Sequence, residues 1–228
     1  MDANQQTRIN PFGMDEECRN CPALCETRTQ VVHGYGDVGA DFLFVLETPG
    51  PGTDEAGIPL VESAQRRSAN RSNGDEPLED DEDGSSLRRI LERLGLCDAT
   101  SDSDRPGLVN SYVTHLARCR DPDREPTDAE ISNCEPYLNA EIRMINPEII
   151  VPVGERALRE IGTEYTTTPV EALDLESHHG DRIRGRGFEL VPMIDPAAQT
   201  DDQRQAWLEA FAALMATDYR QTKGRRER

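Results

Sequence analysis

Four short apolar runs rich in β-branched residues recur along the chain, with helical segments between and after them. This alternation constrains the fold more than any other feature. The runs cover residues 42–45, 109–116, 149–153 and 188–194. Their length and composition are typical of β-strands buried in a sheet. Because strands that alternate with helices favour a parallel sheet covered on both faces, we predict an α/β fold. It has a central, mainly parallel four-stranded sheet flanked by helices in three layers.

Three segments carry helical patterns. In the first, four apolar residues follow helical spacing, namely Leu87, Ile90, Leu91 and Leu94. In the second, Thr127 and Glu130 form a capping box that opens a helix through about Ile145, and Pro147 ends it. The third, residues 201–219, predicts a C-terminal helix that packs one apolar face on the core, made of Trp207, Leu208, Phe211, Leu214 and Met215. Ligands of such sheets bind beyond the carboxyl ends of the strands, so we expect the functional residues just after each strand.

The 228 residues suffice for one hydrophobic core, and residues 1–219 are predicted to form a single domain. Residues 65–86 have no apolar period and contain the acidic run 79–83, which predicts a flexible acidic insertion. Residues 220–228 contain four arginines and Lys223, and we expect a disordered basic tail. No apolar run approaches the roughly 18 residues of a membrane span, and the N-terminus lacks the apolar stretch of a signal peptide. We therefore expect a soluble, cytoplasmic monomer.

The formal net charge is −19, from 44 acidic and 25 basic residues. Such a charge disfavours a polyanionic partner such as nucleic acid. However, Lys223 is the only lysine, and the acidic residues are spread along the whole chain. This pattern is typical of adaptation to a high-salt, halophilic cytoplasm, where salt screens charges within a few ångströms. Net charge then does not exclude DNA as a partner, and local basic residues matter more for DNA binding.

The cysteines indicate a metal site rather than disulfides, because six are few for a disulfide scaffold of this size. Cys18 and Cys21 are two residues apart, so one turn of backbone can present both sulfurs to one metal or cluster. Cys119 follows a predicted strand, and Cys134 lies on the helix that Thr127 opens. Four soft ligands suit either an iron–sulfur cluster or zinc, and their spacing does not choose between them. The other two cysteines are a candidate substitute ligand and an ordinary buried thiol, Cys25 and Cys97 respectively.

A series of short motifs resembles the family 4 uracil-DNA glycosylases and occurs in the same order. The motifs are Cys18-x-x-Cys21-x-x-Leu24 with Arg28, Leu46-Glu-Thr-Pro-Gly50, Gly57-Ile-Pro-Leu-Val61, residues 112–120, Cys134-x-Pro136 and Val153-Gly154. The resemblance extends from about Cys18 to Leu214. It implies the uracil-DNA glycosylase fold and a structural [4Fe–4S] cluster held by Cys18, Cys21, Cys119 and Cys134. It also implies DNA, single- or double-stranded, as the partner.

The resemblance also assigns residues to the reaction. Base-excision enzymes of this kind flip the target nucleotide out of the stack, read its base and hydrolyse the glycosidic bond. Glu47 matches the carboxylate that positions water or stabilises the sugar cation, and Asp54 matches an acidic position further along the same loop. Pro49 and Gly50 give the backbone the tight turn needed to approach a nucleotide closely.

Three positions depart from the family pattern. Leu60 replaces a phenylalanine that stacks on uracil, a contact worth about 1–3 kcal/mol per base. His115 replaces an asparagine that reads the edge of uracil, and histidine does not offer the same bidentate pattern. Asp195 replaces a histidine that donates to the uracil oxygen, and an ionised Asp195 cannot donate.

These departures leave three hypotheses. The first is a DNA glycosylase for uracil or another deaminated base. The second is a catalytically degenerate iron–sulfur protein that binds nucleic acid. The third is a metal-dependent hydrolase with a divalent ion held by Glu47, Asp54, His115 and Asp195. The remaining histidines fall in polar stretches and are expected in surface loops without a role, namely His33, His178 and His179.

Overall fold

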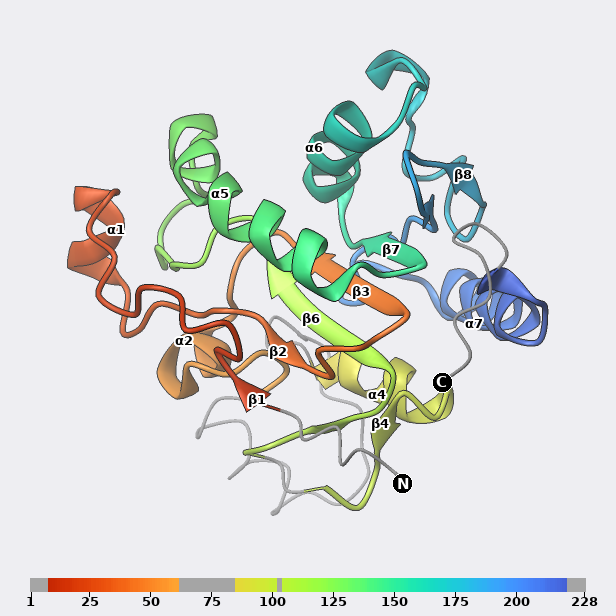
Figure 1. The fold of residues 1–228 in the computed structure, drawn as a ribbon, viewed down its shortest axis with the longest axis horizontal. Helices are drawn as coiled ribbons and strands as arrows, with labels where there is room; N and C mark the ends of the chain where they lie inside the picture. Colours follow the sequence, from red (N-terminus) through yellow and green to blue (C-terminus); the bar gives the residue numbers. More distant parts are fainter. Residues whose placement is uncertain (1–7, 62–84, 102–103, 221–228) are drawn as a thin grey trace.

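The computed structural model describes residues 8–61, 85–101 and 104–220 (Figure 1). Residues 65–84 of the predicted acidic insertion and residues 221–228 of the predicted basic tail lie outside these ranges. Within the described residues, none of the helices combines the length and the apolar character needed to cross a bilayer.

The central sheet contains the predicted parallel strands and extends beyond them at both edges. Its parallel core consists of β6 (Ser111–His115), β3 (Phe42–Leu46), β7 (Ile149–Pro152) and β9 (Glu189–Leu190). Short antiparallel strands extend it, β1 (Arg8–Ile9) and β2 (Tyr35–Gly36) beside β6, and β8 (Ile183–Arg184) beside β9. The sheet of the described residues therefore has seven strands rather than the predicted four. Each added strand has two residues, too few for a period-2 pattern to show in the sequence. A second small sheet pairs β4 (Cys97–Asp98) with β5 (Gly107–Leu108).

The predicted helices are confirmed, with one end corrected. They are α4 (Ser85–Arg93), α5 (Asp128–Ile145) and α7 (Asp201–Met215), so α7 ends before residue 219. The capping box of α5 is present. The Thr127 hydroxyl accepts from the Glu130 amide at 3.3 Å, and the Glu130 carboxylate accepts from the Thr127 amide at 2.8 Å. Asn146, in the left-handed conformation at φ 51°, ends α5 directly before Pro147. The other helices are α1 (Pro22–Thr27), α2 (Pro51–Ala56), α6 (Glu155–Tyr165) and the 3-10 turn η1 (Val170–Ala172).

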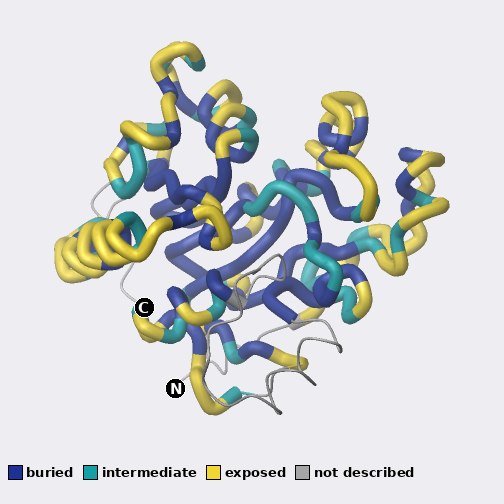
Figure 2. Tube along the Cα trace, turned by 180° about the vertical axis from the view of Figure 1, so that it is seen from behind, coloured by how far each residue is buried: buried dark blue, intermediate teal, exposed yellow. Residues whose placement is uncertain are grey.

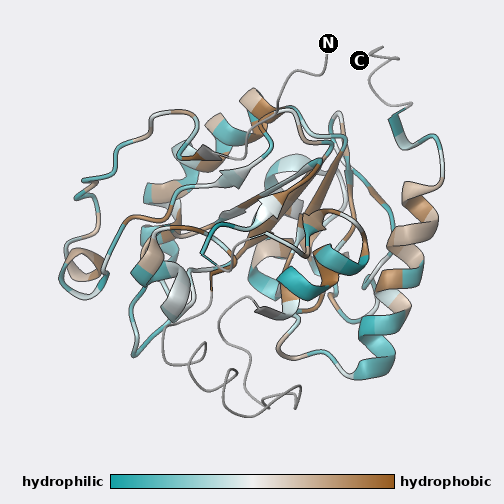
Figure 3. Cartoon of the chain, turned by 90° about the horizontal axis from the view of Figure 1, so that it is seen from below, coloured by the Kyte–Doolittle hydropathy of each residue, from teal (hydrophilic) through white to brown (hydrophobic). Residues whose placement is uncertain are grey.

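Helices cover both faces of the sheet, which confirms the three-layer prediction. Successive side chains of a strand point to opposite faces. Phe42 and Phe44 of β3 accordingly pack in one apolar core with residues of α4 and α7, whereas Leu43 and Val45 pack in a second core with residues of α5 and α6. Figure 2 shows the central strands buried, and Figure 3 shows apolar strands between helices whose outer faces are hydrophilic.

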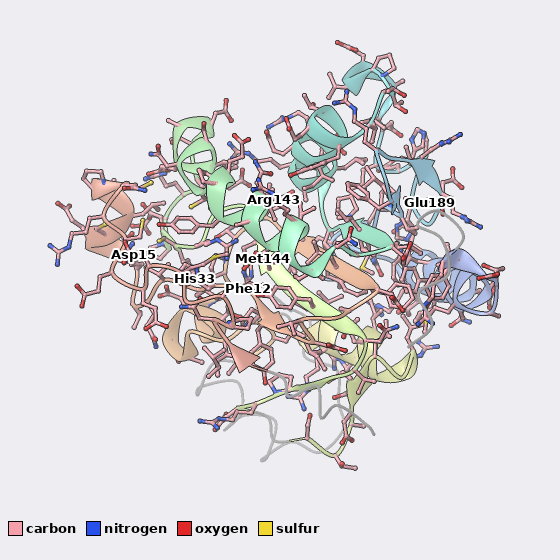
Figure 4. The ribbon with its side chains drawn as sticks, viewed as in Figure 1. Phe12, Asp15, His33, Arg143, Met144 and Glu189 are labelled. Carbon is pink, nitrogen blue, oxygen red and sulfur yellow. The ribbon has the colours of Figure 1, made fainter. Side chains whose placement is uncertain are left out.

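The histidine expected in a surface loop at position 33 is buried instead, so that prediction is wrong. His33 is 3% exposed, and its Nε2 donates to the Asp15 carbonyl at 2.8 Å. Both residues are labelled in Figure 4. Its ring meets that of Tyr137 edge-on, with centroids 5.5 Å apart. Burial, and then the nearby charge of Arg118, lower the pKa of His33. The segment is irregular, as the sequence indicated, but the strands and α5 enclose it.

Candidate active site and cysteine site

A pocket of about 530 Å³ opens where β3 and β6 end. Strands β3 and β6 are parallel, and their last residues, Leu46 and His115, are register partners, so their carboxyl ends meet at one edge of the sheet. The pocket brings together all but one of the residues that the sequence assigned to catalysis or base binding: Glu47, Pro49, Gly50, Leu60, His115 and Asp195.

Glu47 follows β3 directly, and its carboxylate faces the N-terminus of α6. Its Oε1 accepts from the Arg156 backbone amide at 2.9 Å. Burial raises the pKa of Glu47, while the amides of the helix N-terminus oppose this shift. Gly154, at φ +96°, leaves room for the carboxylate, because a Cβ there would lie 2.4 Å from Glu47 Oε1. The Val153-Gly154 motif therefore shapes the surroundings of Glu47.

His115 is the last residue of β6 and is 2% exposed. Burial, and then the charge of Arg118, lower its pKa to about 3, so its imidazole is neutral near pH 7. Within the described part of the chain its ring forms no hydrogen bond, and Nδ1 is buried without a partner. A neutral imidazole carries one donor and one acceptor. His115 can therefore offer either to a ligand in the pocket.

The remaining pocket wall contains an aliphatic side chain and a tight turn. Leu60 is 2% exposed and adopts φ +68°, a conformation that residues other than glycine rarely adopt. Such backbone strain, about 1–3 kcal/mol, is concentrated at functional sites in proteins. Gly50 is the N-cap of α2, and Pro51 begins that helix, so the turn after Pro49 lets the backbone line the pocket.

Asp195 is exposed, and its Oδ1 accepts from the Ala197 amide at 2.9 Å within its own turn. The segment before it is held by His179, for which the sequence indicated no role. His179 Nδ1 accepts from the Ile194 amide at 3.0 Å, and its Nε2 donates to the Gln203 carbonyl at 3.1 Å. His179 thereby joins the Asp195 segment to α7, a contact that no local signal in the sequence could reveal.

Asp54 does not line the pocket. It is 6% exposed, and its Oδ2 accepts from the Thr29 amide at 2.9 Å. Its carboxylate therefore ties α2 to the segment after α1. Because Asp54 lies outside the pocket, the structure does not bring together the four residues of the metal-hydrolase hypothesis.

A second, small cavity is lined by the four cysteines that the sequence grouped together: Cys18, Cys21, Cys119 and Cys134. All four are between 6% and 9% exposed. Across the described residues, no three His, Cys, Asp or Glu side chains form a group that could hold a single metal ion.

Two of the four sulfurs accept hydrogen bonds from neighbouring side chains. The Arg28 guanidinium donates to Cys119 Sγ at 3.1 Å, and the Asn133 amide donates to Cys21 Sγ at 3.5 Å. Tyr137 and Arg118 also line the cavity. Burial raises the pKa of Cys119 to about 11, and the Arg28 bond and charge oppose this shift. Donors and cations around buried sulfurs suit anionic thiolate ligands.

The other two cysteines lie apart from this cavity. Cys97 is buried in the core beside α4, as predicted for an ordinary thiol. Cys25 is partly exposed, and its Sγ donates weakly to the Cys18 carbonyl at 3.7 Å.

Comparison with known proteins identifies the family. The family model described as "Uracil DNA glycosylase superfamily" matches residues 33–215. This chain belongs to the uracil-DNA glycosylase superfamily. It is 32% identical over 193 residues to the "Type-4 uracil-DNA glycosylase" of Saccharolobus solfataricus, which covers 80% of this chain and 72% of that protein. It is 31% identical over 186 residues to the protein of the same name from Pyrobaculum aerophilum, and this match covers 80% of this chain and 79% of that protein. It is 29% identical over 174 residues to the type-4 enzyme of Archaeoglobus fulgidus, and this match covers 76% of this chain and 68% of that protein.

In this superfamily member a buried ion pair borders the cysteine cavity. Arg118 and Glu141 are 1% and 0% exposed, and they form two hydrogen bonds of 2.7 and 3.1 Å. Glu141 also accepts from the Thr114 hydroxyl of β6 at 2.6 Å and from the Gly34 amide at 3.0 Å. The Arg118 charge lowers the pKa of His115, so one cation borders the cysteine cavity and acts electrostatically on a pocket residue.

The pocket of this glycosylase-superfamily chain also has a wall that the sequence did not identify as a unit. The segment after Cys119 contributes Arg120, Asp121, Pro122, Arg124 and Glu125. Only Arg120 belongs to a quoted motif. The sequence did offer a signal for this wall, because the segment joins a cysteine that follows a strand to the capping box of α5.

Proposed function

We propose that the protein is a DNA glycosylase that hydrolyses the N-glycosidic bond of uracil or of another deaminated base. One observation carries the proposal: a single pocket is lined by Glu47, Leu60, His115 and Asp195, which come from four separate motifs. The names of the relatives, type-4 and type-5 uracil-DNA glycosylases, support it.

In this proposal each pocket side chain has a role. A base flipped out of DNA would pack its face against Leu60 and the turn at Pro49 and Gly50, while the neutral ring of His115 meets its polar edge. In hydrolysis, a water oxygen bonds to C1′ of the sugar, the C1′–N bond breaks, and its electron pair leaves with the base. Glu47 would accept a proton from that water and stabilise positive charge on the sugar.

The second candidate is a nucleic-acid-binding protein that has lost catalysis, and Asp195 favours it. This carboxylate is exposed and accepts a hydrogen bond within its own turn, so when ionised it offers no donor to a leaving base that gains negative charge. A protonated Asp195 or another donor would be needed for uracil excision.

We also propose a [4Fe–4S] cluster held by Cys18, Cys21, Cys119 and Cys134. The support is the shared cavity, the donors at Cys119 and Cys21, and the type-4 relatives. When bound, such a cluster supplies a rigid link among the segment before α1, the end of β6 and α5. Arg28 and Asn133 would then orient the ligands from outside.

Excision assays on the purified protein test the activity. Single-stranded and duplex oligonucleotides carrying uracil or hypoxanthine are incubated with the protein at high salt, and abasic sites are then cleaved with alkali. Product that disappears in Glu47→Gln and persists in the control Glu135→Gln, on the exposed face of α5, supports an enzyme. DNA binding without product on any substrate favours the binding protein.

The cluster has a separate test. A broad brown absorbance is expected in the wild type and should be lost in Cys119→Ser or Cys134→Ser, while Cys97→Ser retains it. Zinc without iron in the purified protein would contradict the proposal.

A further inference from the structure

We propose that Arg120 binds a phosphate of the DNA backbone beside the extruded nucleotide. This inference rests on the proposed function, because it takes DNA as the ligand of the pocket. It names a DNA-binding residue that the base-reading motifs do not assign.

The backbone of Arg120 is anchored beside the pocket. Arg120, which directly follows Cys119 in the sequence, is half-buried and lines the pocket. The Thr27 hydroxyl at the end of α1 donates to the Arg120 carbonyl at 3.1 Å. The backbone that carries the guanidinium is therefore held from two sides, by the cysteine site and by α1. Anchoring the backbone reduces the conformational entropy that this residue loses when it binds a ligand.

The charges around the pocket leave this arginine available. The other arginine of the wall, Arg124, is committed to two carboxylates. It donates twice to Glu130, at 2.8 Å each, and lies 3.1 Å from Asp121. In the part of the chain that the structure describes, the Arg120 side chain has no ion pair and no hydrogen bond.

A phosphodiester is the ligand that fits this cation. Glu47 and Asp195 line the same pocket, so a negatively charged strand would be repelled there unless a cation compensates. A flipped nucleotide carries its flanking phosphates to the mouth of the pocket. The planar guanidinium fork matches two phosphate oxygens, and this match makes arginine favoured for phosphate recognition. In a chain with a net charge of −19, such local contacts have to hold the DNA.

The test measures DNA binding of the full-length, cluster-containing protein by fluorescence anisotropy at several salt concentrations. The probe is a single-stranded oligonucleotide with one uracil on a 2′-fluorinated sugar, which resists hydrolysis. Arg120→Ala should bind about tenfold more weakly, and the slope of log affinity against log salt should become shallower by about 0.7, the value for one lost contact to single-stranded DNA. Arg120→Lys, which keeps the charge, should retain the salt slope.

Arg143→Ala is the matched control. Arg143 is labelled in Figure 4; it is exposed two residues before the end of α5 and does not line the pocket. Its loss should change neither affinity nor slope. Cluster absorbance and the thermal midpoint establish that each variant is folded.

Two results would overturn the proposal: wild-type affinity and slope in Arg120→Ala, or an equal loss in Arg143→Ala. A wild-type protein that binds the probe but excises no base from ordinary uracil DNA would contradict the glycosylase activity and leave the Arg120 contact standing. A wild-type protein that binds no DNA would overturn both.

Discussion

Replacing Gly154 by alanine should displace the carboxylate of Glu47. Gly154 precedes α6 at φ +96°, and the new Cβ would lie 2.4 Å from Glu47 Oε1 and 3.0 Å from its Cδ. Ordinary van der Waals contact begins at 3.4 Å, so the oxygen has to retreat by about 1.0 Å, the difference between these two distances. This movement would pull Oε1 away from the Arg156 amide that now donates to it at 2.9 Å.

The displacement and the backbone strain have separate expected magnitudes. A misplacement of 1 Å at a reacting centre can cost on the order of 10²-fold in rate, and we expect a loss of this size in base excision. An alanine at this φ also costs about 1–3 kcal/mol of stability, because L residues rarely adopt it.

Gly187→Ala separates the two effects. Gly187 has a similar φ of +101°, and a Cβ there would meet no atom within 4 Å. The Gly187→Ala variant should therefore lose stability through backbone strain and keep its excision rate. Single-turnover excision and thermal unfolding of both variants, with cluster absorbance as the check on folding, make the comparison. Wild-type excision in Gly154→Ala, or an equal rate loss in Gly187→Ala, would refute the assigned position of Glu47.

Three further predictions concern the core and the pocket. Glu141→Gln should lower the free energy of unfolding by about 3–5 kcal/mol, because it leaves the Arg118 charge buried and unpaired; a denaturant midpoint equal to that of the exposed-site variant Glu135→Gln would contradict this. Leu60→Phe should strengthen binding of free uracil by about 1–3 kcal/mol through stacking, and an unchanged affinity in a binding titration would show that position 60 does not face the base. Because the pKa of His115 falls from its ordinary 6.5 to about 3, the unfolded chain binds the proton more readily between these values. Its contribution to stability is therefore complete above about pH 6.5 and is lost as the pH falls toward 3, with a slope of up to about 1.4 kcal/mol per pH unit. Unfolding curves of His115→Asn should be flatter over this range, and curves parallel to the wild type would mean that the ring titrates normally.

Local patterns were sufficient for much of the fold. The β3 run and the capping box at Thr127 are complete within a few residues, so their elements were predicted with nearly correct bounds. The edge strands were missed because two-residue strands owe their existence to a partner. Tyr35 of β2, for example, pairs with Val113, far along the chain.

For the candidate site, the sequence indicated which residues follow the strands but not where their side chains point. The rule that functional residues follow parallel strands placed Glu47 and His115 correctly at one pocket, because the register of β3 and β6 brings their ends together. It did not distinguish Asp54 from Glu47, since the direction of a side chain on α2 depends on the rotation of that helix against the segment after α1.

By itself the sequence determined the alternation of strands and helices, the Cys18–Cys21 spacing and the order of the motifs, since each depends on local residue patterns. Only the tertiary structure decided which charges are free. Arg124 is paired by Glu130 and Arg120 is left at the pocket without a partner among the described residues, although both lie in one short segment. It likewise decided that His115 is neutral. Burial and ion pairing depend on groups that distant segments bring together, and no local pattern records them.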